Sequence, residues 1–205
     1  MGSGLPVEHL SYDDLRRAAE RFLKEFHPRR AIPVPIEEII DLQFKVDVIP
    51  VPGLHDVCEI DAFITSDLSA IYVDDFVYQH RSNRYRFSLA HELSHAILHQ
   101  ELFRALKFST IKEWVATMPT IPEDEYGWIE WQAYALAGLI LAPQPELRQR
   151  FGRAVARAAK AGLSLSDATD PARAAIAGYL AREFAVSAEV IEKRLAKDGL
   201  WDEVG

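Results

Sequence analysis

The spacing of hydrophobic and polar positions along this 205-residue chain changes several times, and each change predicts a different element. Over residues 11–26 the apolar side chains recur every three or four positions, which is the spacing of one face of an α-helix. Ser11 can cap this helix, and Asp13 and Asp14 suit the positive end of its dipole. A short helix is predicted next, at residues 36–42.

The following part of the chain has the pattern of strands. Apolar residues alternate with polar ones between residues 44 and 51, and prolines end this stretch. Two further apolar runs, at residues 60–65 and 70–74, are separated by a short polar turn, as in a β-hairpin. We expect these segments to form a small antiparallel sheet.

The helical period returns at residues 83–100 and in the strongly apolar stretch 126–141. Residues 101–125 have a mixed pattern with two prolines, and we expect a partly ordered loop there. Helical spacing continues over residues 146–161, and residues 171–198 read as two or three short helices.

This order of elements predicts an α+β fold. The length suffices for one sizeable core, or for one core and a small second domain. We expect a core domain over residues 5–145 and a helical C-terminal segment over residues 146–205.

The composition narrows the class of protein. Hydrophobic residues make up 49% and charged residues 26%, as in soluble globular proteins. No apolar run reaches the roughly 18 residues that a membrane helix needs. The N-terminal Met1-Gly2-Ser3-Gly4 lacks the charged region and apolar core of a secretory signal, and the single cysteine, Cys58, has no internal disulfide partner. We expect a cytoplasmic protein without a membrane partner.

The formal net charge of −8 argues against a protein whose main task is to bind nucleic-acid phosphates. The C-terminal residues 170–198 are nearly neutral, with basic side chains at Arg173, Arg182, Lys193, Arg194 and Lys197. We expect this segment to pack or to recognise a protein, and direct DNA binding stays open. A basic stripe along the preceding helix is predicted to be a solvated face; it consists of Arg150, Arg153, Arg157 and Lys160.

The segment His91-Glu92-Leu93-Ser94-His95 carries the strongest chemical signal. Two histidines four positions apart lie on one face of a helix and can share one metal ion. Glu92 lies beside them and can accept a proton from a metal-activated water. Catalytic zinc takes three protein ligands and keeps its fourth position for water, whose pKa falls to about 7. The spacing predicts a zinc-dependent hydrolase, although histidines at this spacing also occur in helices without a metal.

A third ligand must come from elsewhere in the chain. His99 lies on the same helix face, but at 1.5 Å per residue it is about 12 Å from His91, too far to share a tetrahedral ion. Glu130 begins the most apolar helix, and a charge on its inward face is costly unless it is paired or binds metal. Because Glu130 also suits a solvated position at a helix N-terminus, the residues alone leave its role open.

The chain closely resembles the ImmA/IrrE family of metallo-endopeptidases in the run from Arg86 to His99, which begins Arg-Phe-Ser-Leu-Ala-His-Glu-Leu-Ser-His. A second family motif, a helix that begins with Glu and ends before Pro, is similar to Glu130 through Pro143. The resemblance implies a zincin-like metallopeptidase core in which the HExxH helix and the helix bearing Glu130 pack with the sheet. It also implies that His91, His95 and Glu130 bind Zn²⁺, or Mn²⁺ in its place, with Glu92 as general base.

Members of the family carry a helix-turn-helix-like segment after the core, and residues 172–200 fit this description. Because members cleave helix-turn-helix repressors, the resemblance implies such a repressor as the protein substrate. Two positions depart from the family pattern: Gln132 stands where Glu is frequent, and Tyr134 stands where Asn or Asp is frequent. These positions can orient metal ligands, so the departures bear on metal affinity and activity.

Proteolysis also needs a group that stabilises the oxyanion, and the sequence offers Tyr126, Tyr134, His55 and His80 without ranking them. Two other functions stay open. One is a non-proteolytic regulatory module that binds a repressor or DNA on a zincin scaffold. The other is an interaction partner within a toxin–antitoxin or phage-defence operon.

Overall fold

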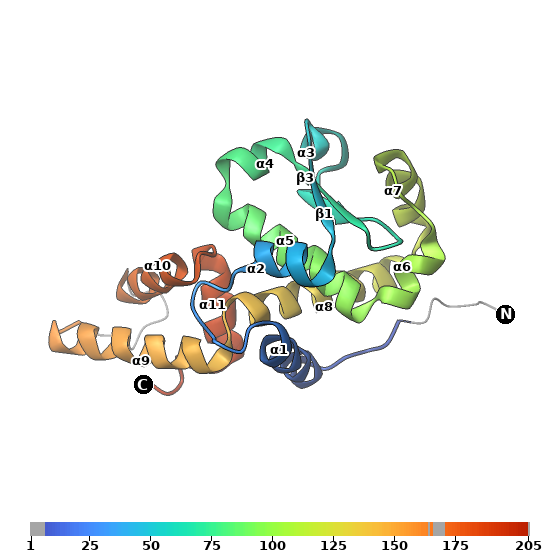
Figure 1. Ribbon diagram of the computed structural model, residues 1–205. Coiled ribbons are helices and arrows are strands. Elements are labelled where there is room, and N and C mark those ends of the chain that lie inside the picture. Colours follow the sequence, from blue (N-terminus) through green and yellow to red (C-terminus); the bar gives the residue numbers. More distant parts are fainter. Residues whose placement is uncertain (1–6, 164, 166–170, 205) are drawn as a thin grey trace.

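The computed structural model describes residues 7–163, 165 and 171–204 (Figure 1). The N-terminal Met1–Gly4, whose sequence lacks the features of a secretory signal, lies outside the described residues. The elements in chain order are α1 (Tyr12–Phe26), α2 (Ile36–Ile39), the π-helix η1 (Ile40–Phe44), β1 (Asp47–Val51), α3 (Leu54–Cys58), β2 (Ala62–Ile64), β3 (Ala70–Asp74), α4 (Asp75–His80), α5 (Ser82–Leu98), α6 (Gln100–Leu106), α7 (Ile111–Thr117), the 3-10 helix η2 (Met118–Thr120), α8 (Glu123–Leu141), α9 (Gln144–Lys160), α10 (Pro171–Phe184) and α11 (Ala188–Lys197).

Helix α1 forms where the sequence predicts it. The side chain of Ser11 accepts the backbone N–H of Asp14 at 3.2 Å, and the Asp14 carboxylate accepts the backbone N–H of Ser11 at 2.9 Å. This capping box satisfies two donors at the start of the helix. The apolar face of α1, including Leu15 and Leu23, is buried, and α1 packs against α8.

The sheet differs from the prediction in one respect. Strands β2 and β3 form the expected antiparallel hairpin, but β1 pairs with β3 in parallel, giving the order β1-β3-β2. The expectation of an entirely antiparallel sheet is therefore wrong for β1. Periodicity places a strand without giving its partner or direction. Pro50 favours the edge position of β1 because proline has no N–H to donate to a second neighbour.

Helices α5 and α8 form the centre of the molecule. Helix α5 contacts β2 and β3 on one side and α8 on the other, and α8 lies between α5 and α1. Figure 1 shows this order from the sheet downward to α1. Because α8 has neighbours on both sides, it is apolar around much of its circumference, as the sequence indicated. The mixed α+β class predicted from the sequence is confirmed.

The segment expected to be a partly ordered loop, residues 101–125, is mostly helical. It contains α6, α7, η2 and the start of α8. Thr110 caps α7 with a capping box that includes Glu113, a sequence signal that the mixed apolar pattern obscured. Leu102, Phe103 and Phe108 are buried, so these short helices are held by packing.

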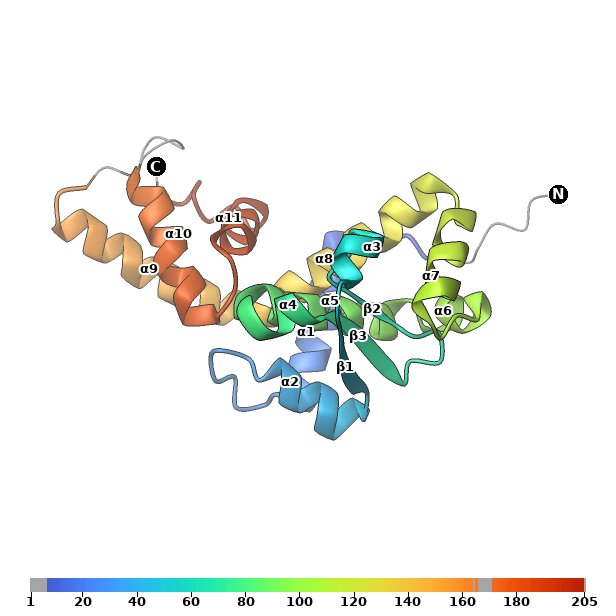
Figure 2. The same ribbon diagram turned by 90° about the horizontal axis from the view of Figure 1, so that it is seen from above.

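Helices α9, α10 and α11 gather at one end of the molecule, and both Figure 1 and Figure 2 show them away from α6 and α7. Two helices occupy residues 171–198, within the predicted two or three. One cluster of buried apolar side chains extends from Leu15 in α1 to Leu200 after α11. The division into a core domain over residues 5–145 and a C-terminal segment over residues 146–205 stays a prediction. Among the described residues, no helix is both long and apolar enough to cross a membrane.

Candidate metal centre

The structure brings together the three side chains that the sequence nominated as metal ligands. His91 and His95 project from consecutive turns of α5, and Glu130 projects from α8, which packs against it. His91 Nε2 lies 3.0 Å from His95 Nε2 and 3.1 Å from Glu130 Oε2, and His95 Nε2 lies 3.5 Å from Glu130 Oε1. Their ligand atoms all lie within 4.8 Å of one another.

These distances fit a tetrahedral metal site. Ligand atoms bonded at about 2.0–2.1 Å to a tetrahedral Zn²⁺ lie about 3.3 Å from one another. The separation of the two imidazole nitrogens, 3.0 Å, and the distance of each nitrogen from one of the two Glu130 oxygens, 3.1 Å and 3.5 Å, are close to this value. Two imidazole nitrogens and one carboxylate oxygen form a donor set that suits zinc and also accommodates other divalent metals. His91, His95 and Glu130 can therefore hold a metal ion with one tetrahedral position left open.

Electrostatics put His95 and Glu130, but not His91, in the protonation states that metal binding needs. Burial lowers the pKa of His95 well below its ordinary value, which keeps the ring neutral. Burial opposes ionisation of Glu130, but the hydrogen bond with His91 and the neighbouring imidazole rings lower its pKa to about 2. Burial also lowers the pKa of His91, but the Glu130 hydrogen bond and the nearby carboxylates outweigh it and raise the pKa overall. A bound cation would displace the His91 proton, since ligands must be deprotonated.

Glu92 lies beside these ligands and is 6% exposed. Its Oε2 accepts the backbone N–H of Ile64 in β2 at 2.8 Å, so the edge of the sheet fixes the carboxylate. Burial raises the pKa of Glu92 to about 8, and the charge of His91 partly offsets this. A carboxyl group with a raised pKa has the affinity for protons that a general base and acid requires.

His99 does not join the group of His91, His95 and Glu130 and lies behind it, as the helix geometry predicted. Its Nδ1 lies 3.1 Å from His95 Nδ1, on the side of the ring away from Glu130. Its Nε2 lies 3.3 Å from Oε1 of Gln132, which is fully buried. Gln132, which departs from the family pattern, is therefore in contact with His99 behind the site.

A cleft of about 550 Å³ opens beside the three ligands and Glu92. Of the four oxyanion candidates, Tyr126 and Tyr134 line the cleft, and His55 and His80 do not. Burial, together with the carboxylates of Glu130 and Glu92, raises the pKa of Tyr126, so its hydroxyl keeps its proton as a hydrogen-bond donor. The hydroxyl of Tyr134 instead accepts a hydrogen bond from Lys193 Nζ at 3.2 Å.

Other residues of the cleft were not found from the sequence. Trp114 and Met118 come from the segment expected to be a loop, and Ser187 and Val190 come from the start of α11. Asn83 Nδ2 donates to the carbonyl of Val186 at 3.0 Å, which holds the α10–α11 connection against α5. No local sequence signal connects these segments to the metal ligands, because only tertiary packing brings them together.

Two of the basic side chains predicted to be solvated are partly packed on α10. Arg150 pairs with Glu183 at 3.2 Å and lies over the ring of Phe184, and Arg157 lies over the ring of Tyr179. The stripe is thus divided between interhelical contacts and solvent.

The chain matches known proteins in two comparisons. The family model of the IrrE N-terminal-like domain, a peptidase family, matches residues 77–196, which is more than half of the chain. A solved structure of a Mycobacterium tuberculosis transcriptional regulator is similar with a TM-score of 0.56 and 18% identity, over 90% of this chain and 46% of that one. The present chain thus spans less than half of that structure, and the likeness shows the fold alone. The comparison with curated proteins gave no match. The chain belongs to the peptidase family defined by the IrrE N-terminal-like domain, as its two motifs indicated.

Proposed function

We propose that this protein is a zinc-dependent endopeptidase in which His91, His95 and Glu130 hold the metal and Glu92 is the general base. The observation that carries the proposal is the group of His91, His95 and Glu130, whose ligand atoms lie within 4.8 Å of one another, with a buried carboxylate beside it. Mn²⁺ is compatible with the same ligands. Membership of a peptidase family supports hydrolysis of a peptide bond.

When bound, the metal supplies a Lewis acid that polarises the peptide carbonyl and lowers the pKa of water. Glu92 accepts the proton of the attacking water and delivers it to the leaving amine. Its hydrogen bond from the Ile64 N–H keeps the carboxylate aimed at the cleft. Tyr126 donates a hydrogen bond from its hydroxyl to the oxyanion from the cleft wall.

The substrate that we propose is a helix-turn-helix transcriptional repressor. The resemblance to a family of metallo-endopeptidases that cleave such repressors supports this class. The cleft beside the three side chains has walls from β2, α7, η2 and the start of α11. Such a cleft suits an extended segment of a protein chain.

The test is Glu92→Gln, which keeps the size of the side chain and removes its basicity. Zinc content and repressor binding should stay at the wild-type level, while cleavage should be lost for a helix-turn-helix repressor that the wild-type protein cuts. Glu101→Gln makes the same change of charge at an exposed position on α6 and should cleave normally. Cleavage by Glu92→Gln at the wild-type rate would exclude this general base.

Metal analysis separates peptidase activity from a purely regulatory binding role. A wild-type protein that binds repressor but takes up no stoichiometric Zn²⁺ or Mn²⁺ would favour the non-proteolytic module. That module holds its partner in the same cleft without hydrolysis.

A further inference from the structure

A row of buried polar groups extends from His95 to the N-terminal segment. Behind the ring of His95, Nδ1 lies 3.1 Å from Nδ1 of His99. The opposite nitrogen of His99, Nε2, lies 3.3 Å from Oε1 of Gln132. The amide nitrogen of Gln132 then donates to the carbonyl oxygen of Glu8 at 2.8 Å. All three side chains are buried, and Gln132 has no exposed surface.

The protons on this row have one consistent arrangement. His95 presents Nε2 to the other two ligand atoms, so that nitrogen carries a lone pair and Nδ1 of the neutral ring carries the proton. His95 Nδ1–H therefore donates to His99 Nδ1, and His99 Nε2–H donates to the oxygen of Gln132. The amide N–H of Gln132 completes the row at Glu8. Every bond has one donor and one acceptor.

We propose that His99 and Gln132 are positioning residues: they fix the tautomer and orientation of His95 for metal binding and connect the metal site to the N-terminal segment. The proposal rests on the metal site proposed above. A hydrogen-bond partner on the second nitrogen of a metal-binding histidine commonly raises metal affinity, and its loss costs about 10- to 100-fold.

The arrangement gives a physical reason for an amide at residue 132. The side chain must accept from His99 on one side and donate to the Glu8 carbonyl on the other. An ionised Glu can make only the first of these bonds, and it would face the carbonyl oxygen with a second acceptor. Glutamine at residue 132 therefore suits a structure in which the N-terminal segment docks on α8.

Aromatic contacts support that docking independently of the hydrogen bonds. The ring of His9 stacks on Trp128 with ring centroids 5.0 Å apart, and Trp128 stacks on Trp131 at 4.8 Å. Both tryptophans belong to α8, on either side of Glu130. The residue next to Glu8 is therefore held against the helix that carries the proposed carboxylate ligand.

Two substitutions at one position separate the two halves of the row. Gln132→Leu removes both bonds, so we expect zinc affinity, measured by competition with a chromophoric chelator, to fall about 10-fold or more. Gln132→Glu keeps the acceptor for His99 but loses the donor for Glu8. Its zinc affinity should stay within a few-fold of wild type, while a glutamyl endopeptidase should cut after Glu8 faster in the full chain.

A spectroscopic measurement tests the proton arrangement directly. In the zinc-loaded protein, ¹⁵N-resolved imidazole spectra should show His99 with its proton on Nε2 and His95 with its proton on Nδ1. The opposite tautomer of His99 would overturn the row. Wild-type zinc affinity in Gln132→Leu would overturn the role of the His99–Gln132 bond in metal binding. Unchanged cutting after Glu8 in Gln132→Glu would overturn the role of the Gln132–Glu8 bond in docking the N-terminal segment.

The controls distinguish this proposal from the proposed function. Gln149→Leu and Gln149→Glu make the same changes at an exposed position on α9 and should behave as wild type. Should Gln132→Leu fail to fold, Gln132→Met removes the same bonds with a more flexible side chain. Absence of metal binding in the wild type would refute the metal site itself, whereas wild-type binding that is insensitive to Gln132 would refute only the positioning role.

Discussion

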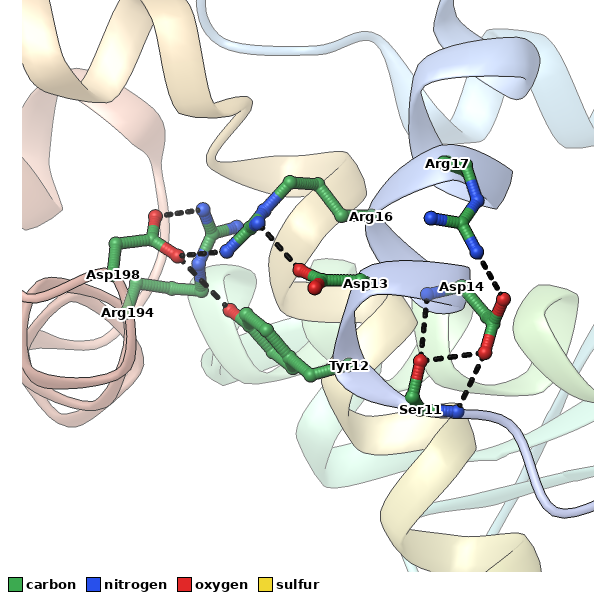
Figure 3. A network of polar contacts seen from close by, with 8 residues as sticks. All are labelled: Ser11, Tyr12, Asp13, Asp14, Arg16, Arg17, Arg194 and Asp198. Carbon is green, nitrogen blue, oxygen red and sulfur yellow. Dashed lines mark hydrogen bonds and ion pairs between the residues drawn. The ribbon is translucent and has the colours of Figure 1, made fainter.

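Arg194 in α11 connects the C-terminal helices to the helix that carries Glu130. It is 4% exposed, and its Nη1 donates to the carbonyl oxygens of Gly138 at 3.0 Å and Ala142 at 2.9 Å. Its Nη2 donates to Asp198 at 2.7 Å, as Figure 3 shows. The two carbonyls lie at the C-terminal end of α8, where the Gly138 carbonyl also accepts the backbone N–H of Ala142 at 3.0 Å and the Ala142 carbonyl follows the last turn of the helix.

Replacing Arg194 by Met keeps an unbranched apolar stem and removes the charge and all donors. The two carbonyls then lose their charged donor, and the fully buried carboxylate of Asp198 keeps only Arg16 at 3.5 Å and the Tyr12 hydroxyl at 3.4 Å. Breaking one side of a buried ion pair costs about 3–5 kcal/mol. For a chain of this length, we expect the Tm to fall by about 6–20 °C.

Urea unfolding followed by circular dichroism measures this loss. A double-mutant cycle with Asp198→Asn should show the coupling: the double variant should lose clearly less than the sum of the two single variants. Lys193→Met is the matched control, because the neighbouring lysine makes exposed contacts that contribute about 1 kcal/mol or less. If Arg194→Met loses no more stability than Lys193→Met, the argument that Arg194 holds the end of α8 is refuted.

Three further predictions concern the site and its support. Glu130→Gln should lower zinc affinity at least about 10-fold in a chelator competition, because it removes the anionic ligand; unchanged affinity would require another third ligand. Tyr126→Phe should lower kcat about 100-fold on a cleaved peptide while leaving KM and zinc content nearly unchanged, and a normal kcat would remove Tyr126 as the oxyanion donor. Asp74 caps α4 and accepts the N–H groups of His55 and Val77; burial raises the pKa of its carboxyl, but these bonds outweigh burial and lower the pKa overall. Asp74→Ala should therefore lower the free energy of unfolding by about 1–2 kcal/mol at pH 7. A carboxyl group whose pKa is lowered in the folded state contributes its full stability only above the pKa that it has in the unfolded state. The difference between variant and wild type in urea titrations should therefore shrink below about pH 4. A deficit that is constant with pH would contradict that reasoning.

The sequence by itself determined the features that depend on neighbours a few positions apart. The start of α1 follows from Ser11 and Asp14, and the pairing of His91 with His95 on one helix face follows from the rise and period of an α-helix. The exclusion of His99 as a ligand follows from the same geometry. The inward face of α8 nominated Glu130, although resemblance was needed to choose between a ligand and a solvated acid.

Only the tertiary structure decided the features that depend on distant parts of the chain. The parallel pairing of β1 with β3 and the helices of the 101–125 segment are set by which surfaces meet in the core. Packing likewise joined Gln132 to the carbonyl of Glu8 and Arg194 to the end of α8. Local spacing fixes which face of an element is apolar or chemically active, whereas partner and direction are fixed by long-range contacts, since their free energy arises only when the separate elements pack together.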